Sequence, residues 1–367
     1  MRSHIPPEVI EKARKRFLEF QERERSRVAR FGNVRPEIAV DFQGYKFVAV
    51  GGRLYYNKRW KFFIDFLLDY IPGLFEKDWF EAEIGKAPEQ RHPVMQWRVD
   101  GMHFIQRQQP KADGTYEATP NGSLLAYLAF AYDVYVVAHN GRLDDRLLSR
   151  LKNSDQFQGA RHELFAEATC FRAGFEIEHE DETDPSSRHV EFTAIHKQTG
   201  QKISVEAKSK HRPGVLGQPG TPEPHGDLNL RFGKLLSDAV AKTPPYPLVV
   251  FFDTNLPLHM ANRVFAFQPG NPMIPSAYVL SVLDRLRKRS GGVDPINHVV
   301  YTNHPDHYLV GDDPAPRKHL LSIFSMVPRT PVTHMQALFD LHQAANLYGN
   351  IPNEFPTTKN EVAGGPP

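Results

Sequence analysis

Residues 189–210 have the sequence HVEFTAIHKQTGQKISVEAKSK. Apolar and polar residues alternate on both sides of Thr199-Gly200, a pair that is typical of a tight turn. The alternation predicts two antiparallel strands, over residues 189–196 and 202–208, joined as a short hairpin. This hairpin is the starting point for the fold and for the site expected on it.

Charged side chains gather at the open end of the predicted hairpin. Because side chains alternate along a strand, Glu206 and Lys208 share one face, while Val205 and Ala207 take the other. The short connection then brings Glu191 beside Glu206. Burying two carboxylates and an ammonium is costly unless they hold one another or a cation. Two carboxylates with open positions suit Mg²⁺ or Mn²⁺, so we expect a metal at this end of the sheet.

The segments around the hairpin predict an α/β domain. A helix over residues 159–173 and a strand over 175–180 precede the hairpin, and a helix over 228–242 and a strand over 247–252 follow it. This order, αβββαβ, predicts a mixed sheet with helices packed on it. A helix over 276–289, a strand over 298–302 and a helix over 333–348 complete the domain.

The first part of the chain predicts an α-rich domain that contains a β-hairpin. The hairpin is expected over residues 39–42 and 45–50, around Gln43-Gly44. Helices are expected over residues 8–30, 60–70, 75–84 and 123–138, with a further helix ending near 152. We therefore divide the chain into an N-terminal domain of unassigned role (1–152), an α/β domain (153–350) and a disordered tail (351–367).

The ordered set Glu163, Glu191, Glu206 and Lys208, on helix, strand and strand, resembles the motif of the PD-(D/E)XK nuclease superfamily. Glu163 corresponds to the helix carboxylate of that family, Glu191 to its strand acid, and Glu206 with Lys208 to its acid-x-lysine pair. The resemblance covers roughly residues 159–253. It implies a restriction-endonuclease-like core and metal-dependent cleavage of phosphodiesters, with Glu163, Glu191 and Glu206 as metal ligands and Lys208 as a catalytic residue.

Alternatives remain open for individual residues. The family's strand acid is usually Asp, and Glu191 is one methylene longer, so Glu178, Glu180 and Asp181 are substitutes for this ligand. Lys208 can instead simply neutralise Glu206 on a solvated sheet face. Glu163 can be an ordinary exposed carboxylate, because such residues are common on helices.

Basic residues follow the predicted site. Lys210 and Arg212 come directly after Lys208, and Arg231 and Lys234 lie on the next predicted helix. Together they can form a local rim that contacts the phosphates of a nucleic acid. The alternative is scattered surface charge.

A second cluster of metal-ligand types follows the predicted strand 298–302. His304, Asp306 and His307 lie within four residues of one another, which is compatible with a metal-binding loop. Pro305 and the polar context favour an exposed turn instead, and we adopt that interpretation.

Composition limits the function. The chain has 367 residues, a net charge of +2 and one cysteine, so a uniformly basic nucleic-acid sleeve and zinc sites built from several cysteines are excluded. Without an N-terminal apolar segment or an apolar run of about 18 residues, we expect a cytoplasmic protein with no membrane partner.

We therefore expect a magnesium-dependent nuclease, acting on DNA and serving in restriction or anti-phage defence, with the N-terminal domain supplying target selection, partner binding or self-assembly. One alternative is a non-catalytic nucleic-acid-binding or assembly protein on the same fold. Another is an enzyme that hydrolyses a different phosphoester.

Overall fold

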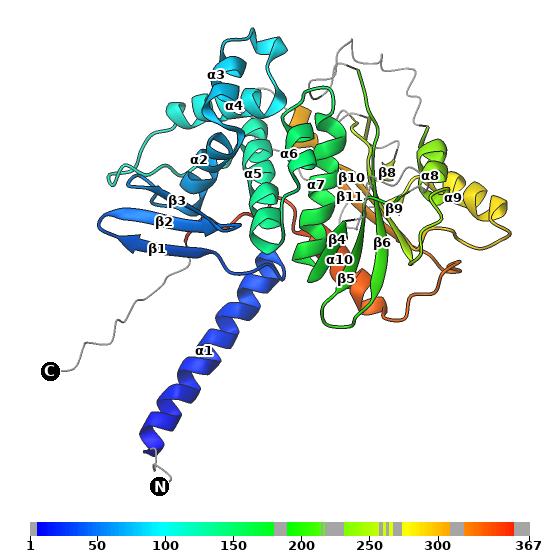
Figure 1. The fold of residues 1–367 in the computed structure, drawn as a ribbon, viewed down its shortest axis with the longest axis horizontal. Helices are drawn as coiled ribbons and strands as arrows, with labels where there is room; N and C mark the ends of the chain where they lie inside the picture. Colours follow the sequence, from blue (N-terminus) through cyan, green and yellow to red (C-terminus); the bar gives the residue numbers. More distant parts are fainter. Residues whose placement is uncertain are drawn as a thin grey trace.

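The computed structural model describes residues 6–179, 189–213, 216, 231–256, 260–261, 264–266, 274–308 and 319–355. Within these residues the protein is mixed α/β. A helical N-terminal region carries a small three-stranded antiparallel sheet, and a six-stranded mixed sheet follows later in the chain (Figure 1).

The N-terminal region contains α1 (Pro7–Phe31), β1 (Ile38–Phe42), β2 (Tyr45–Val50), β3 (Arg53–Asn57), α2 (Phe63–Phe75), α3 (Lys77–Ile84), the 3₁₀ turn η1 (Pro88–Gln90), α4 (Pro93–Arg107), α5 (Gly122–Asn140) and α6 (Asp145–Leu151). The predicted hairpin is confirmed as β1 and β2, and Gln43 and Gly44 both take positive φ at its turn. Strand β3 and helix α4 were not predicted. Helix α2 continues through Pro72, where the sequence predicted its end.

The later part of the chain contains α7 (Phe157–Arg172), β4 (Phe175–His179), β5 (Phe192–His196), β6 (Lys202–Ser209), α8 (Phe232–Val240), β7 (Leu248–Asp253), β8 (Phe265–Ala266), β9 (Ile274–Pro275), α9 (Ala277–Arg289), β10 (His298–Asn303), the 3₁₀ turn η3 (Pro305–Tyr308), β11 (His319–Phe324) and α10 (Met335–Asn346). The order from α7 to β7 confirms the predicted αβββαβ arrangement. Strand β11 was not predicted.

The six-stranded sheet has the order β11-β10-β7-β6-β5-β4. Strands β6, β7 and β10 run parallel, whereas β4, β5 and β11 pair antiparallel with their neighbours. The carboxyl ends of the three parallel strands therefore meet at one edge of the sheet, where functional residues of open α/β sheets commonly gather.

Both faces of this sheet are covered. Helices α7 and α10 pack on one face through apolar residues such as Phe165 and Leu341, which share a core with Val205 and Phe251. Helices α8 and α9 cover the other face, where their apolar residues pack on the neighbouring sheet positions. A strand in such a layer is buried on both sides, so a charged residue on β6 lies in an apolar environment.

Helix α5 is the centre of the N-terminal core. It meets the length and hydropathy criteria of a membrane span, but 89% of that window is buried inside the protein. Its Asp133 forms a buried ion pair with Arg172 of α7, at 2.8 Å between Oδ1 and Nη2. Helix α7 therefore packs on the N-terminal region as well as on the large sheet (Figure 1). The division of the chain into two domains at residue 152 stays a prediction.

The predicted start of the tail needs correction. Residues 351–355 are ordered, because the Phe63 amide donates to the Asn353 carbonyl at 2.8 Å and the Phe355 ring packs edge-on against Phe63. The rest of the predicted tail, residues 356–367, lies outside the described residues.

The junction between α1 and α7 yields a stability prediction. Gly32 has φ +85°, and a Cβ there would lie 2.6 Å from the Arg172 carbonyl oxygen. We expect Gly32→Ala to lower the free energy of unfolding by about 2–3 kcal/mol, because backbone strain adds to a clash with backbone. Urea denaturation measures this change.

Gly44→Ala is the matched control, since Gly44 has φ +76° but open space around the added carbon. It should lower the free energy of unfolding by about 1 kcal/mol, which is the effect of backbone conformation alone. Equal losses in the two variants would contradict the close approach at Gly32.

Candidate metal and catalytic site

The site begins with the register of the β5–β6 hairpin. Phe192 pairs with Val205, and the Glu191 amide donates to the Val205 carbonyl at 3.1 Å. Strand β5 starts at Phe192, so the predicted start at residue 189 is wrong by three residues, and Glu191 lies just before the strand because the regular ladder begins only after it. The pairing still places Glu191 next to Glu206.

Alternation along β6 separates its charged and apolar residues as predicted. Val205 belongs to the core beneath α7, and Ala207 packs against that core. Glu206 is in register with Val250, which belongs to the core beneath α8 and α9. Glu206 is fully buried at 0% exposure, so its carboxylate depends on the few cations that reach it.

Two lysines supply those cations. Lys208 forms an ion pair with Oε1 of Glu206, and Lys242 Nζ lies 2.8 Å from the same oxygen. Lys242 Nζ is also 3.8 Å from Oε1 of Glu191. The structure therefore brings Glu191, Glu206 and Lys208 together, and it adds Lys242, which sequence reasoning did not identify.

Glu191 lies between two groups of acids. Its pKa is raised to about 7, chiefly by burial and further by the charges of Glu163 and Glu206, while Lys242 and Lys208 act in the opposite direction. Repulsion between neighbouring carboxylates makes the site attractive to a cation.

Helix α7 provides the second group of acids. Oε2 of Glu163 accepts a 2.6 Å hydrogen bond from Arg150 Nη1 of α6, and Glu163 lies close enough to Glu191 to raise its pKa. The next turn carries Glu167, which is 1% exposed and whose carboxylate oxygens make no hydrogen bond with the described residues. Burial, together with the charges of Glu163, Asp144 and Glu191, raises the pKa of Glu167 well above its ordinary value.

The donor set fits a hard divalent cation. Glu191 and Glu206 offer carboxylate oxygens. Oε1 of Glu206 is paired with Lys208 and Lys242, whereas its Oε2 makes no hydrogen bond with the described residues. Magnesium and manganese prefer such oxygen ligands. Glu163 is held by Arg150, so it is placed to act on the site through Glu191.

Of the alternatives for the strand acid, Glu178 is less suited, because it is exposed on the edge strand β4, opposite Thr193. Glu180 and Asp181 lie outside the described residues.

The four basic residues of the predicted nucleic-acid rim differ in exposure. Arg212 is 3% exposed, and its guanidinium donates to the Thr254 carbonyl at 3.2 and 3.3 Å. The prediction that Arg212 contacts phosphate is wrong for this arrangement, because the side chain is buried and engaged. Arg231 and Lys234 are exposed at the start of α8, and Lys210 is half-buried.

The interpretation of residues 304–307 as an exposed turn is also wrong. His304 is 2% exposed and Asp306 is 3% exposed, because η3 packs against α5 and the rings of Phe165 and Tyr348 cover His304. The segment that follows β10 is polar in sequence, yet it packs in the interior of the protein.

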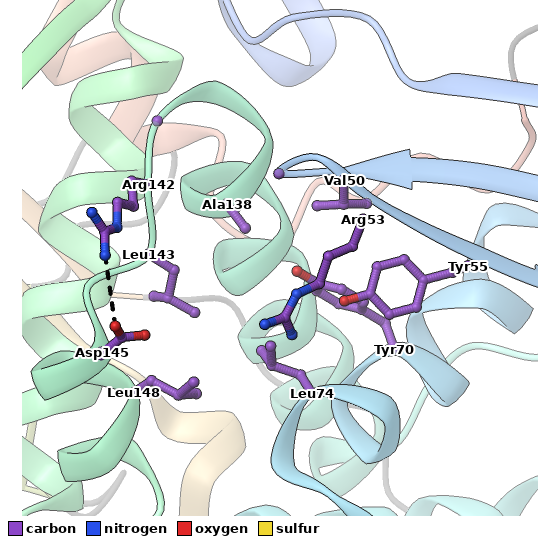
Figure 2. A pocket seen from close by; sticks show the side chains of 12 residues that line it. Val50, Arg53, Tyr55, Tyr70, Leu74, Ala138, Arg142, Leu143, Asp145 and Leu148 are labelled. Atoms are coloured by element: carbon purple, nitrogen blue, oxygen red, sulfur yellow. Dashed lines mark ion pairs between the residues drawn. The ribbon is translucent and has the colours of Figure 1, made fainter.

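The surface hollow shown in Figure 2 lies elsewhere. It has a volume of about 430 Å³ and is lined by residues of the small sheet, α2 and the α5–α6 connection. The Arg53 guanidinium reaches into it above Leu74, while Arg142 turns toward Asp145 at 3.6 Å (Figure 2). None of the four predicted site residues lines this hollow, which is therefore separate from the carboxylate site.

The sequence and the fold match no protein-family model, no curated protein and no solved structure. The case for a function therefore depends on the geometry of this chain.

Glu167 yields a prediction with a defined pH dependence. Its raised pKa means that the folded protein retains a proton that the unfolded chain releases above pH 4.5, so the parent loses stability as pH rises through this range. Glu167→Gln has no such proton to release. We expect it to raise the free energy of unfolding at pH 8 by about 1–2 kcal/mol, with the gain vanishing near pH 4.

Urea denaturation in EDTA from pH 4 to 8 measures this difference. The control is Glu176→Gln, an exposed residue paired with Lys197 at 3.6 Å, which should change stability by less than about 0.5 kcal/mol throughout. Parallel pH curves for the parent and Glu167→Gln would show that Glu167 is ionised in the folded protein.

Proposed function

We propose that this protein is a metal-dependent nuclease that hydrolyses phosphodiester bonds in DNA. The observation that carries the proposal is the convergence on buried Glu206 of Lys208 and Lys242, with Glu191 beside them. This arrangement combines oxygen ligands for a cation with amines that can contact an anion. The order of Glu163 on α7, Glu191 just before β5, and Glu206 with Lys208 on β6 agrees with the resemblance to PD-(D/E)XK nucleases.

Glu191 and Glu206 would hold the metal. A bound Mg²⁺ would supply Lewis-acid polarisation of a phosphoryl oxygen and lower the pKa of a coordinated water. The carboxylate form of Glu191, whose pKa of about 7 reflects burial and its acidic neighbours, would be stabilised by a nearby cation. Glu163, held at 2.6 Å by Arg150, reinforces the negative potential.

The lysines provide the positive charge that the reaction requires. Lys208 lies against the Glu206 carboxylate, where its ammonium can orient an attacking water and offset the negative charge that develops on the phosphoryl oxygens. Lys242 reaches the same carboxylate from the turn that follows α8 and can contact the scissile phosphate. Arg231 and Lys234 at the start of α8 are suited to contact more distant phosphates.

The variants Glu206→Gln and Lys208→Met test this proposal. Each should reduce Mg²⁺-dependent cleavage of plasmid and linear DNA by at least about 100-fold, because each removes a charge that acts on the transition state. Gel assays of cleavage with Mg²⁺, Mn²⁺ or EDTA measure the loss, and circular dichroism confirms folding.

Lys202→Met is the matched control. Lys202 lies on the same strand, over the ring of Tyr246 at 5.4 Å, and its replacement should leave cleavage within about twofold. If the parent binds DNA equally with Mg²⁺ and EDTA and leaves it intact, the chain is a binding protein. Cleavage of RNA or a nucleotide in place of DNA would contradict the substrate assignment, and parental rates in both site variants would contradict the site.

A further inference from the structure

Three side chains from separate elements meet beneath the sheet edge. His162 comes from α7, Asp253 ends β7, and His304 follows β10. One ligand atom from each lies within 4.8 Å of the others. All three residues are buried, with exposures of 0%, 0% and 2%. We call them the His162 cluster.

Two residues of this cluster have buried polar atoms without a well-formed partner. Neither ring nitrogen of His162 makes a well-formed hydrogen bond with the described residues, although the Phe251 backbone lies close. Oδ2 of Asp253 also lacks one, whereas its carboxylate interacts with the Asn255 backbone, and its Oδ1 is 3.4 Å from the Thr302 hydroxyl. Buried groups of this kind usually have a partner, so the cluster calls for one.

Ligand chemistry points to a cation as that partner. Asp253 offers a carboxylate oxygen and the two histidines offer ring nitrogens, and groups of both kinds bind divalent ions directly. The buried guanidiniums of Arg161 and Arg212 also act on the Asp253 carboxylate.

Aromatic rings enclose the cluster. The Phe165 ring stacks on His162 with centroids 5.7 Å apart and meets His304 edge-on at 5.3 Å. Tyr348 covers His304 at 4.5 Å. A dry shell of this kind fixes ligand orientation and strengthens a metal bond by excluding water.

We propose that His162, Asp253 and His304 form a buried site for a transition-metal dication of the Zn²⁺ class. Two imidazoles and one carboxylate are a ligand set that zinc accepts, with bonds of roughly 2.0–2.2 Å, so at a tetrahedral angle two ligand atoms are about 3.3–3.6 Å apart. The three ligand atoms here lie within 4.8 Å of one another, a range that includes this span.

The ion has a structural role. It ties α7 to the carboxyl ends of β7 and β10, and His162 immediately precedes Glu163, so it also fixes the helix that carries Glu163 and Glu167. This site is independent of the proposed nuclease function, because it shares no ligand with the pair Glu191 and Glu206.

A neighbouring group, His304 with Asp306 and His307, meets the same 4.8 Å criterion. We assign the ion to the His162 cluster because its ligands come from three elements that the fold brings together. Asp306 and His307 of that group are instead neighbours in one 3₁₀ turn, with His307 Nε2 3.7 Å from Oδ2 of Asp306.

Zinc titration of the full chain tests the site. All measurements use a Glu206→Gln background, so that the carboxylate pair contributes little to binding. After EDTA treatment and removal of the chelator, calorimetry with ZnCl₂ should show one tight site per chain. Co²⁺ should give a visible absorption spectrum of a site with nitrogen ligands. His162→Gln and Asp253→Asn should each weaken Zn²⁺ binding by at least about 100-fold and abolish the Co²⁺ spectrum.

His298→Gln is the matched control. His298 is also fully buried, lies at the start of β10 and belongs to no such group among the described residues, so its replacement should leave Zn²⁺ binding unchanged. Circular dichroism of each metal-free variant establishes that the binding losses occur in folded protein. Binding in His162→Gln equal to that of the parent background would overturn the proposal, as would absence of a tight site in that background. A loss in Asp306→Asn with no loss in Asp253→Asn would overturn the assignment to this cluster.

Discussion

The Glu206 carboxylate lies where no solvent reaches it, and its charge is balanced by amines from two different elements. An ionised carboxylate in such a place is tolerated only with close cationic partners. Lys208 comes from the same strand, whereas Lys242 comes from the end of the helix that covers this face. The local packing of β6 and of the segment that follows α8 thus depends on this electrostatic balance.

Helix α7 connects this balance to the rest of the molecule. It packs on the N-terminal core and on the large sheet, and its buried Arg172 pairs with Asp133 of α5. One part of its surface carries Glu163 and Glu167 near Glu191, and another carries His162 against the ends of β7 and β10. A shift of α7 would therefore affect the carboxylate site and the His162 cluster together.

Much of the α/β part was predictable because its signals are local. The turn at Thr199-Gly200 sets the register of the hairpin, and alternation along β6 sets the faces of Glu206 and Val205. The order αβββαβ follows from apolar periodicity in short segments. These features need no knowledge of distant residues.

The features that the sequence failed to predict depend on packing between distant parts of the chain. Lys242 reaches Glu206 only because α8 lies on the sheet, and nothing in its own sequence context indicates this contact. Arg212 and His304 carry polar side chains that usually lie at the surface, yet other elements cover them here. Helix α4 was missed because Gly101 and several polar residues weaken its pattern, although Gly101 allows close packing against Leu124 of α5.

The titration of Glu191 tests the central claim most directly. In EDTA, carbon-detected NMR of the Glu191 carboxyl should give a pKa of about 7, which should fall in Glu206→Gln because a like charge is removed. Addition of Mg²⁺ to the parent should also lower this pKa, since a bound cation favours the carboxylate. A pKa near the ordinary 4.5, unaffected by Mg²⁺ or by the charge of Glu206, would show that the carboxylates do not form one cation-binding unit.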